Sequence, residues 1–288
     1  MNKPILQTKG LSHVYSQDTP FQKTAVNDIN IDIFSGEYIG IIGHTGSGKS
    51  TLIQHLNALL KPSSGQILYN DQDIWEKKYN RSLLRFNVGL VFQYPEYQLF
   101  EETVEKDIAY GPKNMGLSAD EISERVHLAL KFVGLDENIL QSSPFELSGG
   151  QKRRVAIAGI MAMQPKILIF DEPTAGLDPR GRDEILSRIS NYRDSEKCTV
   201  LLVSHSMEDI ASHTEKVLVM DKGSVWMFAP TAEIFEHSSE LLNMGLDVPQ
   251  ITKVFLSLKN KGHNVKSSVF TTKQACDEIM SILGEKND

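Results

Sequence analysis

The chain has 288 residues, of which 40% are hydrophobic and 23% charged, the composition of an ordinary globular protein. This length exceeds the usual size of one domain, so we expect a large α/β core with an insertion and a smaller appendage. The formal net charge of −7 argues against a protein whose main partner is nucleic acid, because such proteins need a basic surface.

Two strands are predicted at the start of the chain, over residues 5–15 and 29–33. Both alternate apolar and polar side chains, and a polar loop separates them, so we expect them to pair antiparallel. The first strand ends in Tyr15, upstream of the glycine-rich loop described next. An aromatic ring at that place could stack on adenine, whose face accepts any ring. The alternative is a half-exposed tyrosine at a sheet edge.

The sequence GHTGSGKS, residues 43–50, predicts a loop that holds phosphate groups. Its glycines, Gly43, Gly46 and Gly48, accept positive φ angles and leave no Cβ between backbone and ligand. Successive N–H groups can therefore point at anionic oxygens. The alternative, a glycine turn that binds nothing, would leave the lysine and serine at its end unexplained.

The surroundings of this loop favour a P-loop, because an apolar strand over residues 38–42 precedes it and a helical segment from residue 50 to 56 follows it. In that motif Lys49 reaches the β- and γ-phosphates, the Ser50 hydroxyl ligates Mg²⁺, and the helix N-terminus adds its dipole. The residues predicted to surround the nucleotide are Gly43, His44, Thr45, Gly46, Ser47, Gly48, Lys49, Ser50 and Thr51.

A short buried strand over residues 88–92 stops at Gln93. A polar residue at the carboxyl end of a strand in an α/β sheet lies where ligands gather, although a solvated loop glutamine is the alternative. From Pro95 onward, residues 103–110, 118–134 and 149–163 have helical spacing, which predicts a helical insertion.

The chain then returns to the sheet, where an apolar strand over residues 167–170 ends in Asp171 and Glu172. In a protein with a P-loop, two carboxylates at a strand end form the Walker B arrangement, one acid for Mg²⁺ and the next to polarise water. Solvated strand-end acids are the alternative. The strand from 199 to 203 delivers His205, a lone histidine that could be structural. Convergence of parallel strands on one edge favours a role in the site.

The rest of the chain is predicted to hold a hairpin over residues 217–220 and 224–228 and two late amphipathic helices, one after Pro249 and one over 272–283. The two cysteines, Cys198 and Cys276, lack metal-ligand spacing and a disulfide framework, and we expect buried, unreactive thiols.

No apolar run reaches the roughly 20 residues of a membrane span. The longest, from Val155 to Met163, is far shorter, and the N-terminus lacks the apolar segment of a signal peptide. We therefore expect a cytoplasmic protein that does not cross a membrane by itself.

A second glycine-rich segment, LSGGQ at residues 147–151, starts a predicted helix and must face another nucleotide than the first loop. Together with the P-loop, the paired acids and His205, it resembles the nucleotide-binding subunit of ABC transporters. The resemblance implies an α/β P-loop NTPase with a RecA-like core, an N-terminal antiparallel β subdomain, an α-helical insertion and a small helical C-terminal region. The implied division is a core over 1–95 and 160–237, a helical subdomain over 96–159 and a dimerisation region over 240–288.

The same resemblance assigns roles within a site shared by two chains, which sandwich ATP between the P-loop of one and LSGGQ of the other. Gln93 becomes the Q-loop, Tyr15 the A-loop aromatic, and residues 175–178 the D-loop, where Ala175-Gly176 replaces the Ser-Ala of many members. The resemblance assigns catalysis to Glu172, His205, Lys49 and Gln93, and Mg²⁺ binding to Ser50, Gln93 and Asp171. It also implies that nucleotide is contacted across the dimer by the residues of the opposite chain that correspond to Ser148, Gly149, Gly150, Gln151 and Asp178.

A narrower resemblance lies in residues 93–100, 107–114 and 171–179, which are similar to the ATPase subunits of energy-coupling factor vitamin and metal importers. His44-Thr45 favours the second of the two paralogous ATPases. This resemblance implies a heterodimer with the paralogue, an integral membrane coupling subunit, a substrate-binding membrane subunit reached indirectly, and a peripheral location on the cytoplasmic face of the membrane.

Two other classes of protein compete with this interpretation. A soluble ABC ATPase of repair or translation would act on nucleic acid, but such proteins usually carry coiled-coil insertions or tandem nucleotide domains, and this sequence has neither. A P-loop kinase or GTPase leaves LSGGQ unexplained. The transported solute does not follow from the sequence, because another subunit would recognise it.

Overall fold

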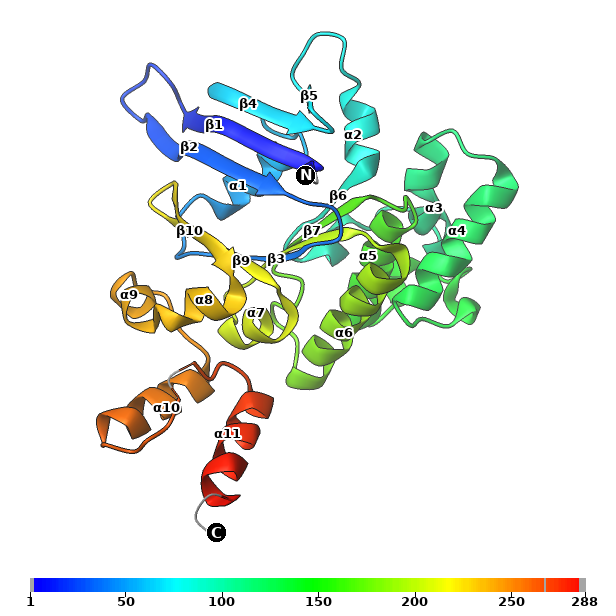
Figure 1. Cartoon of the computed structure of the whole chain (residues 1–288). Coiled ribbons are helices and arrows are strands. Elements are labelled where there is room, and N and C mark those ends of the chain that lie inside the picture. The colour runs from blue at the N-terminus through cyan, green and yellow to red at the C-terminus, as the bar shows by residue number, and fades with distance from the viewer. Residues whose placement is uncertain (1–2, 267, 285–288) are drawn as a thin grey trace.

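A computed structural model describes residues 3–266 and 268–284, which form two sheets with helices around them (Figure 1). The smaller sheet is antiparallel, in the order β2-β1-β4-β5, and contains β1 (Leu6–Tyr15), β2 (Lys23–Ile33), β4 (Ser64–Tyr69) and β5 (Gln72–Asp73).

The predicted pairing of the first two strands is confirmed, since Leu6 pairs with Ile33. The second strand starts six residues earlier than predicted, at Lys23. Between Val26 and Ile29 it carries one residue more than the facing stretch of β1, and Asp28 there has a φ of +51°. This β-bulge breaks the alternation on which the sequence prediction relied.

The larger sheet has the order β10-β9-β3-β8-β7-β6, and β10 alone is antiparallel to its neighbour. Its strands are β3 (Tyr38–Ile42), β6 (Val88–Val91), β7 (Ile167–Asp171), β8 (Thr199–Val203), β9 (Lys216–Asp221) and β10 (Ser224–Pro230). The predicted hairpin of β9 and β10 is confirmed.

Each central strand of this sheet serves two hydrophobic cores, because successive side chains point to opposite faces. On β7, Ile167 and Ile169 join the core shared with the small sheet and α1 (Lys49–Leu56), whereas Leu168 and Phe170 join the core under the helical side. Burial on both faces explains why these strands are continuous apolar runs.

The predicted helical insertion is confirmed as η1 (Pro95–Gln98), α3 (Val104–Asn114), α4 (Ala119–Phe132), η2 (Glu137–Ile139), η3 (Pro144–Glu146) and α5 (Gly149–Met161), which gather at one side of the molecule (Figure 1). Outside the insertion the chain also forms α2 (Arg81–Asn87), α6 (Pro179–Glu196) and α7 (Met207–His213). A capping box of Ser118 and Glu121 starts α4.

The C-terminal part consists of α8 (Thr231–Glu236), α9 (Ser238–Asn243), α10 (Gln250–Asn260) and α11 (Thr272–Gly284), and α10 and α11 lie far from the small sheet (Figure 1). Their own core is small, built on Phe255, Val269 and Ala275. Within residues 3–266 and 268–284 no helix is both long and apolar enough for a membrane span.

The expectation of two buried thiols is half correct. Cys198 is buried, and burial raises the pKa of its thiol to about 12. Cys276 is exposed, so the prediction was wrong there. The physical reason is that α11 buries only Ala275, and the next residue along the helix points to solvent.

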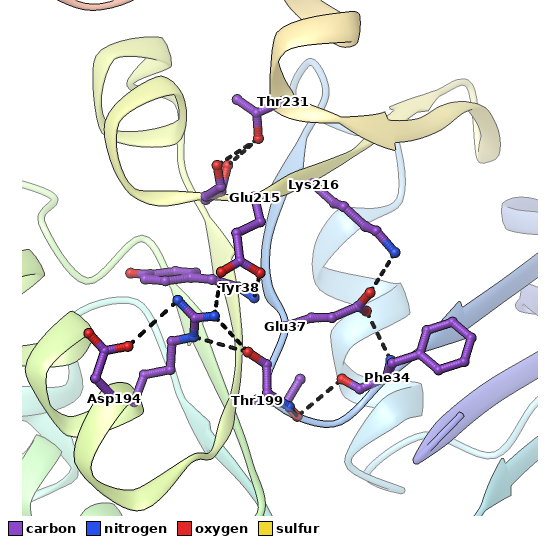
Figure 2. Close-up of polar contacts among 11 residues, drawn as sticks. Phe34, Glu37, Tyr38, Asp194, Thr199, Glu215, Lys216 and Thr231 are labelled. Atoms are coloured by element: carbon purple, nitrogen blue, oxygen red, sulfur yellow. Dashed lines mark hydrogen bonds and ion pairs between the residues drawn. The ribbon is translucent and has the colours of Figure 1, made fainter. Parts of the chain in front are cut away.

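A cluster of polar side chains lies at the N-terminal end of β3, opposite the end that leads into the glycine-rich loop. Figure 2 shows the Glu37 carboxylate between the Lys216 ammonium and the Phe34 N–H, which donates over 2.9 Å. Arg193, in the last turn of α6, donates to the Gly36 carbonyl over 3.0 and 2.8 Å and pairs with the Glu215 carboxylate. The cluster therefore ties α6, β9 and the turn before β3 together.

We expect Arg193→Ala to lower the free energy of unfolding by about 1–3 kcal/mol, because it removes charge-assisted hydrogen bonds to a partly buried carbonyl. Arg180→Ala, an exposed arginine on the same helix, is the matched control and should stay within about 0.5 kcal/mol of wild type. Urea unfolding measures both. Equal effects of the two changes would show that the cluster does not stabilise the fold.

Candidate functional site

The predicted phosphate-binding loop connects β3 to α1 and borders an open cavity of about 460 Å³. Gly43, Gly46 and Gly48 have φ angles of +156°, +82° and +103°, which side chains with a Cβ rarely adopt. Of the residues predicted for the site, the cavity is lined by Tyr15, Thr45, Gly46, Gly48, Lys49, Ser50, Thr51, Gln93, Glu172 and His205.

The β9–β10 turn supports the loop from behind. The Gly223 N–H donates to the Ser47 carbonyl over 3.1 Å, and the Gly223 carbonyl accepts from the Asn27 N–H over 2.7 Å. The His44 ring lies 3.1 Å from the Asp221 carboxylate through Nε2. Main-chain hydrogen bonds thus connect the loop to the hairpin, and the hairpin to β2.

The side chain of Lys49, the first residue of α1, bends back over the loop. Its ammonium donates to the carbonyls of Gly43 over 2.6 Å and His44 over 3.1 Å. Burial lowers the pKa of Lys49, and the carboxylates of Glu172 and Asp171 oppose that change. The cation is therefore held at the base of the cavity, where it would meet phosphate oxygens.

Ser50 and Asp171 bring two oxygen ligands together next to Lys49. The Ser50 side chain is close enough to the Asp171 carboxylate to favour its charged form. Burial and the neighbouring Glu172 raise the pKa of Asp171, while Lys49 and the Ser50 side chain oppose the rise. The described residues hold no cluster of three His, Cys, Asp or Glu suited to a metal. A hydroxyl beside one carboxylate fits Mg²⁺, which binds few protein ligands and completes its shell with phosphate oxygens and water.

Glu172 lines the cavity and contacts residues from two neighbouring strand ends. Its own φ is +51°, and its N–H donates to the Val203 carbonyl over 3.0 Å. One carboxylate oxygen lies 2.9 Å from His205 Nε2, and the other accepts from the Gln93 amide over 3.1 Å. The ends of β6, β7 and β8 therefore meet at a single carboxylate, and a strained backbone of this kind is typical of functional sites.

Tyr15 belongs to the same cavity but comes from the small sheet. Its hydroxyl lies 3.3 Å from Thr51 Oγ1. Lys23 pairs with Tyr15 across β1 and β2 and lines the cavity with Ala25. Lys23 and Ala25 were not predicted from the sequence, because the bulge in β2 changes the register that brings them to the site.

The LSGGQ residues do not line this cavity. Ser148 and Gln151 cap the start of α5 reciprocally, with N–H to side-chain distances of 3.3 and 3.0 Å. Gly149 and Gly150 are exposed, and no atom lies within 4 Å of where a Cβ would stand. Asp178 caps the start of α6 by accepting from a main-chain N–H over 2.7 Å. These residues form a surface that faces outward.

Arg153, which the sequence analysis also missed, joins three motifs from a buried position on α5. It binds both carboxylate oxygens of Glu96 at 3.1 and 2.9 Å, donates to the Pro173 and Ala175 carbonyls at 3.3 and 2.7 Å, and lies over the Tyr94 ring. Burial raises the pKa of Glu96, but the hydrogen bonds and charge of Arg153 and a main-chain hydrogen bond together outweigh it, so the net pKa is lowered. The loops after Gln93 and Glu172 are thereby linked to the LSGGQ helix.

An apolar groove of about 340 Å³ lies between η1, α3 and α5. Phe100 and Tyr110 meet edge to face at its rim, with ring centroids 4.9 Å apart, and both rings are about half exposed. Leu99 and Ile160 also line the groove. Exposed aromatics beside a groove indicate an interaction surface.

Comparison with protein families places residues 26–175 in the family described as ABC transporter. An energy-coupling factor transporter ATP-binding protein EcfA2 of Clostridium tetani is 55% identical over 98% of this chain and 98% of that protein. The EcfA2 of Clostridium perfringens is 52% identical over 98% of this chain and 99% of that protein.

Solved structures show the same fold. CbiO1 from Clostridium perfringens, part of the ABC transporter complex cbiONQ, has a TM-score of 0.74 and 39% identity over 87% of this chain and 98% of that chain. The dimeric ATP-binding cassette MJ0796 bound to ADP and Pi has a TM-score of 0.69 and 26% identity over 78% of this chain and 98% of that chain. The predicted fold class is thereby confirmed.

The glycines of the loop differ in what surrounds them, which allows a matched test. A Cβ on Gly48 would lie 2.5 Å from the Ala25 carbonyl oxygen, whereas a Cβ on Gly46 would meet nothing within 4 Å. We expect backbone strain of about 1–2 kcal/mol in either alanine variant, and about 1–3 kcal/mol more in Gly48→Ala because of the clash. Urea unfolding without nucleotide measures the difference, and equal stabilities would contradict it.

Proposed function

Because this chain belongs to the ABC transporter family, as an ATP-hydrolysing subunit of an energy-coupling factor importer, we propose that it powers uptake by closing on a second ATPase subunit around ATP. The supporting observation is the separation of the two nucleotide-binding elements on one chain. The P-loop borders the cavity, whereas the exposed Gly149 and Gly150 lie outside its lining. Each chain thus supplies half of two sites, and closure completes both.

In the complete site, Lys49 and the loop amides hold the phosphates, and Tyr15 stacks on the adenine at the other end of the cavity. Ser50, Asp171 and Gln93 would hold Mg²⁺, which when bound neutralises charge on the phosphate oxygens. Position and electrostatics dominate this kind of reaction, so the placement of these side chains carries most of the rate.

Glu172 is the proposed base for the attacking water. In the present arrangement His205 and Gln93 occupy both of its carboxylate oxygens. In the ATP-bound site, His205 and Gln93 could instead bind the γ-phosphate and the attacking water. One oxygen of the Glu172 carboxylate would then be free to accept the proton of that water. His205 then braces the γ-phosphate. The partner subunit completes the nucleotide-binding site with its counterparts of five residues: Ser148, Gly149, Gly150, Gln151 and Asp178.

The groove beside α3 and α5 is the proposed docking place of an integral membrane coupling subunit. An apolar helix in a groove is a common mode of recognition, and the aromatic rim would supply the anchors. Arg153 connects the residues after Gln93 to α5, so a contact made at the γ-phosphate can move the groove as one unit with the helical subdomain.

We propose the partner of the dimer to be a paralogous ATPase, and the location to be the cytoplasmic face of the membrane, where a substrate-binding subunit is reached through the coupling subunit. Residues 1–95 and 160–237 form the nucleotide-binding core in this scheme, and 96–159 form the helical subdomain. Residues 240–288 contribute to dimerisation, which agrees with the exposed Ile279, Met280 and Leu283 on α11.

Glu172→Gln is expected to reduce ATP turnover by a factor on the order of 10²–10⁴ while ATP binding stays nearly intact, because the amide keeps the shape and loses the base. Glu208→Gln, at an acid outside the cavity, is the matched control. Turnover and nucleotide retention are measured together. Wild-type turnover in the Glu172 variant, or loss of binding, contradicts the assignment.

Phe100→Asp is expected to weaken docking to the membrane subunit by about tenfold or more, because a charge at an apolar anchor removes a central contact. Leu128→Asp, an exposed apolar position on α4 outside the groove, should not. Co-expression with the paralogue and the membrane subunit, followed by purification in detergent, measures docking. Unchanged assembly would exclude this groove, and a fully active homodimer that ignores both candidates would exclude the heteromer.

A further inference from the structure

Two histidines lie behind Tyr15 and belong to none of the roles above. His55, on α1, is completely buried. Its Nδ1 lies 2.7 Å from the Thr51 carbonyl oxygen, and its Nε2 lies 3.2 Å from Nδ1 of His13 on β1. The carbonyl oxygen of Lys61 lies 3.2 Å from that same nitrogen of His13.

These contacts determine where the protons are. A carbonyl can only accept, so Nδ1 of His55 carries a hydrogen. The Lys61 carbonyl likewise requires a hydrogen on Nδ1 of His13, so Nε2 of His55 is the acceptor in the contact between the two rings. Burial, which lowers the pKa of His55, favours this neutral ring. Nδ1 of His13 must then donate, to His55 and to Lys61. Both rings are thus fixed in tautomer and orientation.

The fixed His13 ring supports Tyr15 directly. The His13 and Tyr15 rings meet edge to face with centroids 4.5 Å apart and planes at 76°. The His13 and His55 rings meet in the same way at 4.7 Å. The Tyr15 hydroxyl reaches Thr51 on α1 at 3.3 Å. Tyr15 is therefore held at its ring and at its hydroxyl, and both contacts lead to α1.

We propose that His13 and His55 are positioning residues that hold the Tyr15 ring ready to receive the adenine base. The first residues of α1, Lys49 and Ser50, lie where the phosphates are expected. The same helix would then also position the Tyr15 ring, at the end of the cavity that receives the adenine. This inference rests on the proposed stacking role of Tyr15. Affinity falls by about two- to tenfold when a side chain has to become ordered on binding. Contacts that order the Tyr15 ring before binding would remove a penalty of this size.

The test compares His13→Ala, Tyr15→Ala and the double variant with wild type. The ligands are the β,γ-imido analogue of ATP and inorganic tripolyphosphate, which has no base. We expect His13→Ala to weaken the ATP analogue about two- to tenfold and to leave tripolyphosphate unchanged. In the Tyr15→Ala background the same change should have no further effect, because the residue acts through the tyrosine.

Two more variants separate positioning from general damage. His13→Phe keeps a ring beside Tyr15 but removes the donor to His55. His55→Asn keeps a donor near the Thr51 carbonyl but is too short to replace Nε2, the atom that accepts from His13. Both should lower the quenching of an etheno-adenosine nucleotide that reports stacking. His127→Ala, on α4 away from the cavity, is the control and should change neither affinity nor quenching.

An undiminished effect of His13→Ala in the Tyr15→Ala background would overturn the proposal, as would equal losses for the ATP analogue and tripolyphosphate. The proposal is also overturned if Tyr15→Ala weakens binding but His13→Ala and His55→Asn both keep wild-type affinity and quenching. If Tyr15→Ala leaves the ATP analogue unaffected, the stacking role itself fails, and the positioning role fails with it.

Discussion

The site depends on one constraint, the parallel alignment of three strands that end at the same level. Val203 of β8 pairs with Ile41 of β3 on one side and with Asp171 of β7 on the other. The chain after each strand therefore leaves the sheet at one edge, which is where ligands bind in α/β folds. The phosphate-binding loop, Glu172 and His205 meet there for this reason. A register shift of one residue in any of these strands would separate them.

Buried charge in this molecule is consistently paired, and the pairs connect motifs that are far apart in the chain. Arg153 would be costly to bury alone, but Glu96 and two carbonyls satisfy it. The pair holds the η1 loop, the LSGGQ helix and the loop after Glu172 as one body. Lys49 is buried against loop carbonyls and two acids in the same way. In the proposed function, phosphate binding by Lys49 and coupling to the groove through Arg153 would therefore both depend on buried, paired cations.

The molecule also carries surfaces that its own fold leaves open. The first turn of α5 exposes Gly149 and Gly150, and the apolar groove presents Phe100 and Tyr110. Both surfaces lie on the helical insertion, whereas the cavity lies on the core. An ATPase that works by closure needs this separation, because the nucleotide can then control the distance between two chains and the position of a docked partner together.

Much of this protein could be predicted from the sequence, since the phosphate-binding loop, the paired acids, LSGGQ and the apolar strands are local patterns whose chemistry depends on near neighbours. The start of β2, the exposure of Cys276, and the places of Lys23 and Arg153 could not. Each depends on contacts between distant segments: a bulge that shifts the register, a helix that buries one residue, a cross-strand neighbour, and a buried arginine whose partners lie on two separate loops. The tertiary structure alone decided these, because no local pattern specifies which distant groups will meet.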